Sequence, residues 1–245
     1  MRLADQISMR SRQRKFALFM ETIAPTAETT VLDVGVEDFA FGELSDNEVG
    51  GCETLNYFEE LYPWRERITA VGLHEGERFR ASYPSVTYVK GDALNLPFED
   101  NAFDVIFSNA VIEHVGGREE QRRFVAEGLR VARRAFITTP NRWFPVEVHT
   151  RLPFVHWLPD PLSERAYDLA RKSWAKEICL LGPGALRELF PAGRGHARRL
   201  GRGARTPSPT TCASGRRRAR RAGRGASARA AAGCAPRRET TGWAS

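Results

Sequence analysis

The stretch GDALNLPFEDNAFDVIFSNAVIEHV, from Gly91 to Val115, decides the fold class of this chain. It begins where one predicted strand ends in Asp92, continues through an LPF turn, and enters a second apolar run that starts at Phe103. The pair Glu113-His114 follows this run and predicts the start of a helix. Short apolar runs bounded by polar turn residues indicate buried strands of an α/β sheet.

Strand and helix signals alternate on both sides of this stretch. Strands are predicted at residues 30–34, 67–74, 85–92, from 103 onward, and at 133–141. Helices are predicted at residues 5–23, 54–63 and 118–132, with a further one within 173–190. Such alternation requires right-handed crossovers and favours a parallel sheet with helices on both faces. We therefore expect a doubly wound, mostly parallel, Rossmann-like α/β fold.

Two of these helices have an apolar face that predicts how they pack. The helix at 5–23 is expected to pack on the domain through its aromatic residues and to leave Lys15 in solvent. The helix at 54–63 is expected to bury Leu61 together with its other apolar residues.

Length, charge and cysteine usage limit the class of protein. The chain has 245 residues, enough for one α/β domain, and a net charge of +7. Residues 192–245 contain fourteen arginines and a single acid, Glu239, so the rest of the chain is mildly acidic. No window approaches the roughly 18 apolar residues of a membrane span. The four cysteines lie far apart and form no CxxC pair, which favours reduced thiols and a cytoplasmic protein.

The C-terminal segment 192–245 differs in composition from the rest of the chain. It is rich in Arg, Gly and Ala, and Leu200 is its only branched aliphatic residue. Such a segment cannot bury enough apolar surface to offset the entropy of ordering, so we expect it to be disordered. Two interpretations stay open: an Arg-rich arm that binds nucleic acid or acidic membrane, or the product of a shifted reading frame in a GC-rich gene.

Polar residues stand at the carboxyl ends of the predicted strands, where parallel sheets bind ligands. These residues are Asp33 and Gly35, His74 and Glu75, Asp92, and Asn109. A dinucleotide site needs glycines that let the backbone approach a pyrophosphate, and the acids Glu37 and Asp38 would oppose that charge. S-adenosylmethionine has no phosphate and carries an ammonium and a sulfonium, so an acidic loop suits it.

These motifs, in this order, resemble the class I S-adenosylmethionine-dependent methyltransferases of the small-molecule type. The run from Gly91 to Val115 carries most of the likeness, which extends over residues 31–141 and more loosely to Phe190. The first motif departs from D-x-G-x-G-x-G, since Glu37 stands where the second glycine belongs. The resemblance implies a Rossmann-like sheet, S-adenosylmethionine as cofactor and methyl transfer to a small-molecule acceptor. In that fold two antiparallel strands follow Phe190, and we expect this chain to lack them.

The resemblance implies a role for each strand end. Asp33 would face the ammonium of the cofactor, and Gly35 would let the backbone approach it. Glu75, or His74 if the register shifts by one, would bind the ribose, and Asp92 would accept from the adenine amino group. The implied cofactor residues are Asp33, Gly35, Val36, His74, Glu75, Asp92, Ala93, Leu94, Asn109 and Ala110. For each acid alone, loop or helix-cap duty is the competing interpretation.

His114 is the candidate catalytic base. Methyl transfer is an in-line displacement, so the protein chiefly aligns donor and acceptor and excludes water. A base is needed only if the acceptor must lose a proton, and a histidine titrates in the right range for that task. A structural role is the alternative for this residue.

The segment from Thr138 to Leu162 follows the fifth strand and combines aromatic residues with prolines. It is interpreted as a pocket or lid for a flat or amphipathic acceptor, as a small satellite core, or as a membrane-surface contact. The candidate acceptor residues are Asn141, Arg142, Trp143, His149, His156 and Trp157. His149 and His156 are seven positions apart with no cysteine nearby, so we expect no metal site.

Four segments and two functions are expected from these observations. The segments are an N-terminal helix (1–25), a cofactor-binding core (26–141), an acceptor-side lid with the last helix (142–191), and the basic tail (192–245). The first functional hypothesis is methylation of a small molecule, impaired if the C-terminus is frameshifted. The second is a noncatalytic methyltransferase-like protein that binds nucleic acid or acidic membrane through its tail, the only part expected to contact nucleic acid.

Overall fold

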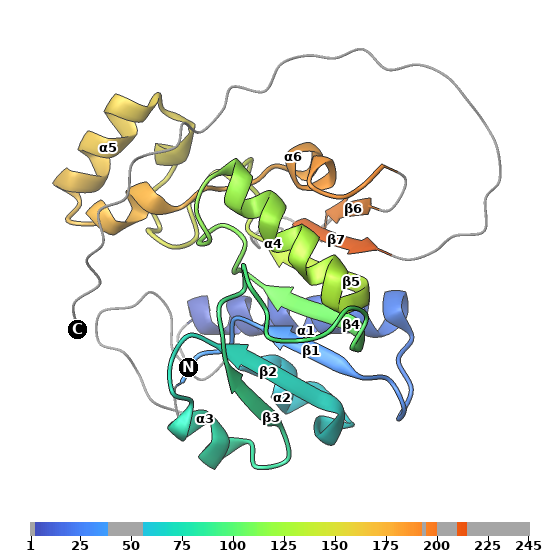
Figure 1. The fold of residues 1–245 in the computed structure, drawn as a ribbon. Coiled ribbons are helices and arrows are strands. Elements are labelled where there is room, and N and C mark those ends of the chain that lie inside the picture. Colours follow the sequence, from blue (N-terminus) through green and yellow to red (C-terminus); the bar gives the residue numbers. More distant parts are fainter. Residues whose placement is uncertain (1–2, 39–55, 193–194, 200–209, 215–245) are drawn as a thin grey trace.

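The computed structural model describes residues 3–38, 56–192, 195–199 and 210–214. These residues form one sheet between two layers of helices, which confirms the predicted α/β fold (Figure 1). The strands are β1 (Val31–Val34), β2 (Ile68–Gly72), β3 (Thr87–Lys90), β4 (Phe103–Asn109), β5 (Ala132–Thr139), β6 (Gly195–Arg199) and β7 (Thr210–Ser214). Their order in the sheet is β3-β2-β1-β4-β5-β7-β6.

The helices connect these strands and cover both faces of the sheet. The α-helices are α1 (Leu3–Ile23), α2 (Tyr57–Leu61), α3 (Glu77–Ser82), α4 (Arg118–Val131), α5 (Asp160–Leu169) and α6 (Pro183–Glu188). The 3₁₀ helices are η2 (Arg65–Arg67), η3 (Val155–Trp157) and η4 (Ser173–Glu177). Within the described ranges, no helix has both the length and the apolar character that crossing a bilayer requires.

Strand β1 lies in the middle of the parallel part of the sheet. It pairs in parallel with β2 on one side and with β4 on the other. All four of its residues are buried, because helices cover both faces of the sheet. Side chains alternate along a strand, so Val31 packs in one apolar cluster while Leu32 and Val34 pack in the other.

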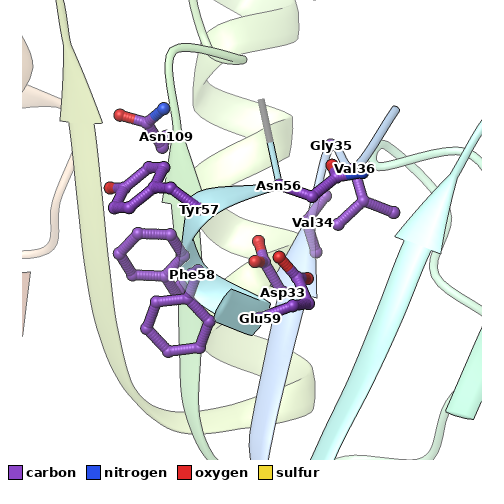
Figure 2. Close-up of a pocket in the computed structure, with 10 residues that line it drawn as sticks. Asp33, Val34, Gly35, Val36, Asn56, Tyr57, Phe58, Glu59 and Asn109 are labelled. Atoms are coloured by element: carbon purple, nitrogen blue, oxygen red, sulfur yellow. The ribbon is translucent and has the colours of Figure 1, made fainter. Parts of the chain in front are cut away.

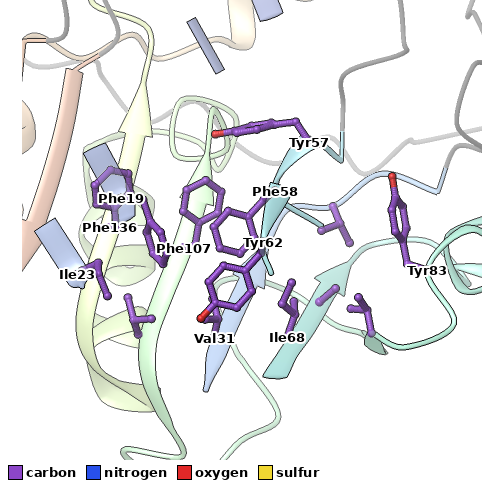
Figure 3. Packing of buried hydrophobic residues seen from close by; sticks show 14 of the residues in the cluster. Phe19, Ile23, Val31, Tyr57, Phe58, Tyr62, Ile68, Tyr83, Phe107 and Phe136 are labelled. Atoms are coloured by element: carbon purple, nitrogen blue, oxygen red, sulfur yellow. The ribbon is translucent and has the colours of Figure 1, made fainter. Parts of the chain in front are cut away.

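An aromatic cluster holds α1 and α2 against the sheet (Figure 3). Phe19 of α1 meets Phe58 of α2, Phe107 of β4 and Phe136 of β5 edge to face, with ring centroids 5.1 to 5.5 Å apart. This is a favourable arrangement for aromatic rings, and it adds to the burial of their large apolar area. The packing fixes α1 beside α2 over the parallel strands.

The opposite face of the sheet is covered by α4 and α6. Phe124 and Val125 of α4 and Leu186 of α6 are buried in one cluster with Ile106 of β4. Because α4 presents these apolar residues at helical spacing, its other face stays polar and meets solvent. The two layers of helices enclose the sheet.

The sheet contains the two strands that the sequence was expected to lack. β7 pairs antiparallel with β5, with Phe136 opposite Ala213 and Thr139 opposite Thr210, and β6 pairs antiparallel with β7. The expectation of a missing hairpin, and of disorder at residues 195–199 and 210–214, is therefore wrong. An edge hairpin is ordered by main-chain hydrogen bonds to an existing strand, which need no apolar run. The rest of the tail lies outside the described residues, so its two interpretations stay predictions.

Two expectations about side-chain burial are also wrong. Leu61 is 36% exposed and Glu59 is fully buried instead, because the short helix α2 points Phe58 and Tyr62, four positions apart, toward the sheet. Lys15 is buried with only 9% exposure, since it lies four positions before the buried Phe19 on the same helix face. Residues 54 and 55, predicted as part of the same helix as Leu61, lie outside the described residues.

The pair Glu113-His114 lies in a turn and does not open a helix. Helix α4 begins at Arg118, after Gly116 and Gly117. The φ of Gly116 is 115°, which lies outside the helical range and separates the turn from the helix. The turn therefore places Glu113 and His114 between the end of β4 and the start of α4.

Candidate functional site

A small pocket lies at the carboxyl ends of β1 and β4, beside α2 (Figure 2). Its lining residues are Asp33, Val34, Gly35, Val36, Asn56, Tyr57, Phe58, Glu59, Phe107 and Asn109. The end of β1 supplies one wall and α2 supplies another. This is the edge at which parallel α/β sheets bind ligands.

Two buried carboxyl groups lie side by side in the pocket wall (Figure 2). Asp33 of β1 is 5% exposed, and Glu59 of α2 is fully buried. Burial raises the pKa of Asp33 to about 7, and burial together with the charge of Asp33 raises the pKa of Glu59 well above its usual range. Neither oxygen of Glu59 has a hydrogen-bond partner within the described part of the chain. Buried polar atoms without partners are costly, so this wall is suited to a cation or a hydrogen-bond donor.

Gly35 occupies a position that no larger residue fits. Its φ is +96°, a left-handed conformation, and a Cβ atom there would lie 2.1 Å from Cγ2 of Val111. The N–H groups of Gly35 and Val36 both donate to the carbonyl of Val71, at 2.9 and 3.2 Å. Only glycine adopts this turn without strain, so the backbone enters the pocket directly after β1.

Helix α1 brings a buried amine to the end of β4. The Nζ atom of Lys15 donates to Oδ1 of Asn109 at 2.6 Å. Burial, together with the charge of Arg12, lowers the pKa of Lys15 to about 7. Arg12 lies 5.9 Å from the ring centroid of Tyr57, a pocket-lining residue. The basic groups of α1 therefore stand close to the pocket that contains the two carboxyl groups.

The acidic loop after Gly35 is fixed to the neighbouring helices. The carboxylate of Asp38 accepts hydrogen bonds from the backbone N–H groups of Gly76 and Phe79, at 3.1 and 2.9 Å, and so caps the start of α3. The backbone of Glu37 exchanges two hydrogen bonds with the side chain of Asn56. Asp38, which departs from a glycine-rich pattern, thus has a structural role beside the pocket.

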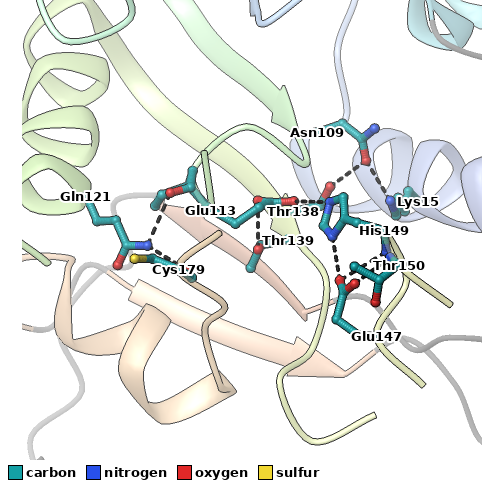
Figure 4. Close-up of polar contacts among 11 residues, drawn as sticks. Lys15, Asn109, Glu113, Gln121, Thr138, Thr139, Glu147, His149, Thr150 and Cys179 are labelled. Carbon is teal, nitrogen blue, oxygen red and sulfur yellow. Dashed lines mark hydrogen bonds and ion pairs between the residues drawn. The ribbon is translucent and has the colours of Figure 1, made fainter. Parts of the chain in front are cut away.

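A second polar cluster joins the turn after β4 to residues 147–150 (Figure 4). Oε2 of the fully buried Glu113 accepts the hydroxyl of Thr139 at 2.9 Å, whereas its Oε1 has no hydrogen-bond partner among the described residues. Nδ1 of His149 lies 2.7 Å from Oε1 of Glu147, and Nε2 lies 3.7 Å from Oε1 of Glu113. The exposed ring of His114 meets His149 edge to face, 5.0 Å between centroids.

The protonation of this cluster follows from its contacts. Burial alone would raise the pKa of Glu147, but the hydrogen bond from His149 and the backbone and side-chain donors around it lower that pKa to about 2. Burial alone would lower the pKa of His149, yet the hydrogen bond to Glu147 and the charge of Glu113 raise it. Glu147 is therefore an ionised acceptor that orients the imidazole ring.

The segment after β5 exposes aromatic side chains. Trp143 is 59% exposed, and Trp157 is 43% exposed while its Nε1 donates to the carbonyl of Arg142 at 2.8 Å. His156 is buried, with Nε2 2.9 Å from the carbonyl oxygen of Phe144. Hydrogen bonds thus hold the backbone of the segment while the tryptophans face solvent.

Comparison with known proteins identifies this architecture. Residues 48–135 match the methyltransferase domain family. The strand order, with a parallel sheet that ends in an antiparallel hairpin, agrees with that match. Over these residues the chain is similar to the methyltransferase domain of the class I S-adenosylmethionine-dependent enzymes.

Two curated methyltransferases resemble parts of this chain. The ubiquinone/menaquinone biosynthesis C-methyltransferase of Roseobacter denitrificans is 29% identical over 153 residues, which are 61% of this chain and 52% of that protein. The phthiotriol/phenolphthiotriol dimycocerosates methyltransferase of Mycobacterium tuberculosis is 39% identical over 107 residues, or 42% of this chain and 35% of that protein. The chain thus spans about half, or less, of the length of these relatives.

Two solved methyltransferase structures share the fold. The 1,6-didemethyltoxoflavin-N1-methyltransferase of Burkholderia thailandensis, with its substrate and S-adenosylhomocysteine bound, is 16% identical with a TM-score of 0.52, covering 83% of this chain and 77% of that one. The magnesium protoporphyrin IX methyltransferase of Synechocystis PCC 6803, with bound S-adenosylhomocysteine, is 10% identical with a TM-score of 0.53, covering 87% of each chain. At such low identity these likenesses show the fold alone, and none of the comparisons supports a noncatalytic nucleic-acid-binding role.

The structure brings part of the predicted cofactor set together. Asp33, Gly35, Val36 and Asn109 all line the pocket. Ala110 follows directly and has a φ of 60°, which is unusual for a residue with a side chain and marks backbone strain beside the site.

The other predicted cofactor residues lie outside the pocket lining and have local partners. Glu75 forms an ion pair with Lys90, which lowers the pKa of Glu75. The carboxylate of Asp92 accepts the backbone N–H of Leu94 at 2.9 Å. The side chain of His74 is exposed. Ala93 and Leu94 are half-buried and pack against the apolar cluster under α4.

Several polar residues of these clusters were not predicted from the sequence, among them Lys15, Tyr57, Glu59 and Glu147. The signal for Lys15 was present, since it lies on the α1 face that carries Phe19. The signal for Glu147 was its spacing of two from His149, which lets a carboxylate reach the ring. Nothing in the local sequence distinguishes Glu59 from Glu60, because α2 is too short to reveal a periodic pattern.

Proposed function

We propose that this chain binds S-adenosylmethionine at the pocket and transfers its methyl group to a small-molecule acceptor. The observation that carries the proposal is the pair of buried carboxyl groups in the pocket lining, Asp33 at the end of β1 and Glu59 of α2, the latter with no hydrogen-bond partner among the described residues. An ammonium donates the hydrogen bonds that the oxygens of Glu59 lack. The residues present therefore suit the amino-acid part of the cofactor.

The carboxylate of the cofactor would also have a partner in the site. Lys15 would hold the carboxylate, since its amine is buried and stands at the end of β4. Gly35 would let the backbone approach the same part of the cofactor, because no Cβ fills the turn. When bound, the cofactor supplies a methyl group activated by its sulfonium. The chain itself orients the two reactants and excludes water from them.

The remaining strand ends are proposed to bind the nucleoside part. Glu75, or His74 beside it, would accept the ribose hydroxyls, and Asp92 would accept the adenine amino group between Ala93 and Leu94. Support comes from their place at the ends of β2 and β3, on the edge that includes the pocket. Glu75 must exchange its Lys90 partner for this role, and both side chains are exposed enough to do so.

The acceptor is proposed to be a flat or amphipathic small molecule. Exposed aromatic faces at Trp143 and Trp157, with Phe154 in contact with the latter at 5.2 Å between centroids, support an acceptor surface in the segment after β5. Asn141, Arg142, His149 and His156 belong to the same segment. His114 is exposed and stands after β4, so it is proposed as the base for an acceptor that must lose a proton.

Calorimetric titration with S-adenosylmethionine and S-adenosylhomocysteine tests the proposal. We expect micromolar affinity, about −8 kcal/mol, for the full chain. The variant Asp33→Asn should bind at least about tenfold more weakly, because a neutral amide replaces one of the buried acids. Glu60→Gln, an exposed acid next to Glu59, should bind as the parent does. A folded parent that binds neither compound would contradict the proposal.

A further inference from the structure

The second polar cluster contains three groups that a metal ion would use as ligands. One ligand atom each from Glu113, His114 and His149 lies within 4.8 Å of the other two. The three differ in exposure: Glu113 is buried, His149 is half-buried and His114 is exposed. We propose that this cluster is a binding site for a divalent cation of the zinc class.

The contact with Glu147 determines the tautomer of His149. Oε1 of Glu147 accepts the backbone N–H of His149 at 3.0 Å and lies 2.7 Å from Nδ1 of the same residue, so this oxygen is an acceptor and Nδ1 carries the hydrogen of the bond. A ring that donates from Nδ1 can offer the lone pair of Nε2 to a metal ion that displaces the Nε2 proton. A carboxylate behind a histidine is the usual arrangement behind a metal-bound imidazole, where it fixes the ring and its tautomer.

The atom that faces this lone pair is Oε1 of Glu113. Oε1 of Glu113 lies 3.7 Å from Nε2, too far for a hydrogen bond, and has no hydrogen-bond partner among the described residues although it is buried. The charge of Glu113 acts to raise the pKa of Lys15. The amine of Lys15, however, donates its hydrogen bond to Oδ1 of Asn109. A buried carboxylate oxygen and a ring nitrogen that face each other at this distance can both bind one cation.

The donor set and the spacing select the kind of cation. Two imidazole nitrogens and one carboxylate oxygen are a known ligand set for zinc, with bonds of roughly 2.0 to 2.2 Å and a fourth position left open. A separation of 3.7 Å between Nε2 and Oε1 is compatible with one ion bonded to both. A small rotation of the exposed His114 ring completes the set. The ion would tie residues 147–150 to the end of β4 and present its open position toward solvent.

The site differs from the pair that the sequence drew attention to. His149 and His156 are seven positions apart, but His156 is turned to the carbonyl of Phe144. The ligands instead come from a turn after β4 and a turn after β5. The inference does not depend on cofactor binding, so it is tested without S-adenosylmethionine. For His114 it is an alternative to the base role, because a metal-bound ring nitrogen cannot take up a proton.

Metal titration of the full chain tests the proposal. After treatment with a chelator, the protein is titrated with Zn²⁺ by calorimetry, and Co²⁺ is added to record the visible absorption of a four-coordinate site. We expect one Zn²⁺ per chain and a rise in the unfolding midpoint of roughly 5–10 °C at a hundredfold excess over Kd. Failure of the folded chain to bind Zn²⁺ would overturn the proposal.

Variants separate this site from adventitious binding. His114→Gln and His149→Gln should each weaken Zn²⁺ binding by more than about tenfold, and Glu147→Gln should weaken it by about 10- to 100-fold through loss of ring orientation. His74→Gln, an exposed histidine at the end of β2, should bind Zn²⁺ as the parent does. Should His114→Gln retain the parent affinity and Co²⁺ spectrum while folded, the three-ligand site would be wrong.

Discussion

Asp33 and Glu59 are two acids in one buried wall of the pocket, and the burial of Asp33 makes the free energy of unfolding depend on pH. Burial raises the pKa of Asp33 to about 7 from an ordinary value of 3.8. Between these values the folded state holds a proton that the unfolded state releases, so the free energy of unfolding falls as pH rises from about 4 to about 7. Above pH 7 the full cost of burying the charge is present.

The variant Asp33→Asn should therefore be more stable than the parent at pH 8 and nearly equal to it at pH 4. The difference in the free energy of unfolding should grow to a few kcal/mol across this window, since each pKa unit corresponds to about 1.4 kcal/mol. Urea unfolding at a series of pH values measures it. Glu60→Gln controls for charge alone, and a parent-to-variant difference that does not change with pH would disprove the assignment.

Lys15 has the opposite pH dependence. Burial lowers its pKa from 10.5 to about 7, so between these values the unfolded state binds more protons than the folded state and stability rises with pH. Lys15→Met should stabilise the free protein at pH 6, where the buried amine is charged, and weaken S-adenosylmethionine binding at least about tenfold.

Thermal unfolding and calorimetric titration of the same Lys15→Met sample test both effects. Arg10→Met, an exposed cation on the same helix, is the matched control and should change neither. Equal cofactor affinity in parent and Lys15→Met would remove Lys15 from the proposed site.

Residue identities at the strand ends were predictable only in part. Asp33 and Asn109 follow apolar runs, and parallel strands bring their carboxyl ends to one edge, so their meeting was predictable. Glu59 and Lys15 come from helices whose orientation depends on the packing of Phe58 and Phe19. That packing is a tertiary property, and no local pattern contains it.

At the scale of elements, the loop after β1 is linked to α3. Asp38→Ala removes an acceptor from the backbone N–H groups of Gly76 and Phe79, which no residue of α3 replaces. We expect a loss of about 1–2 kcal/mol in the free energy of unfolding, the usual cost of a lost helix cap. Urea denaturation measures it, with Asp38→Asn as the conservative control because its amide oxygen still accepts. If Asp38→Ala has the same free energy of unfolding as the parent, water replaces the carboxylate as the helix cap.

The parallel strands and α4 were predictable as elements because each has a run of apolar residues at the matching period. Boundaries and the edge hairpin were not. Gly116 and Gly117 ended the turn before α4, where the apolar pattern had no break. β6 and β7 consist of GHARR and TTCAS, which have no apolar run of their own. They form because β7 pairs with β5 and β6 pairs with β7.

For the whole molecule, the hairpin determines whether the sheet has an open edge. A chain that ends at residue 192 lacks β6 and β7, and it leaves the backbone groups of β5 between Phe136 and Thr139 without their β7 partners. Unpaired edges template association with other chains, so we expect this variant to self-associate and to unfold at a lower temperature than the full chain.

A chain that ends at residue 214 separates the hairpin from the arginines. It keeps β6 and β7 but removes nine of the fourteen arginines of the tail. Sedimentation velocity at several concentrations should give this variant the behaviour of the full chain, because the edge of β5 stays covered. If the chain ending at 192 also sediments and melts like the full chain, β7 does not protect the edge. If it alone aggregates, the order of this hairpin, and not the charge of the tail, keeps the sheet closed.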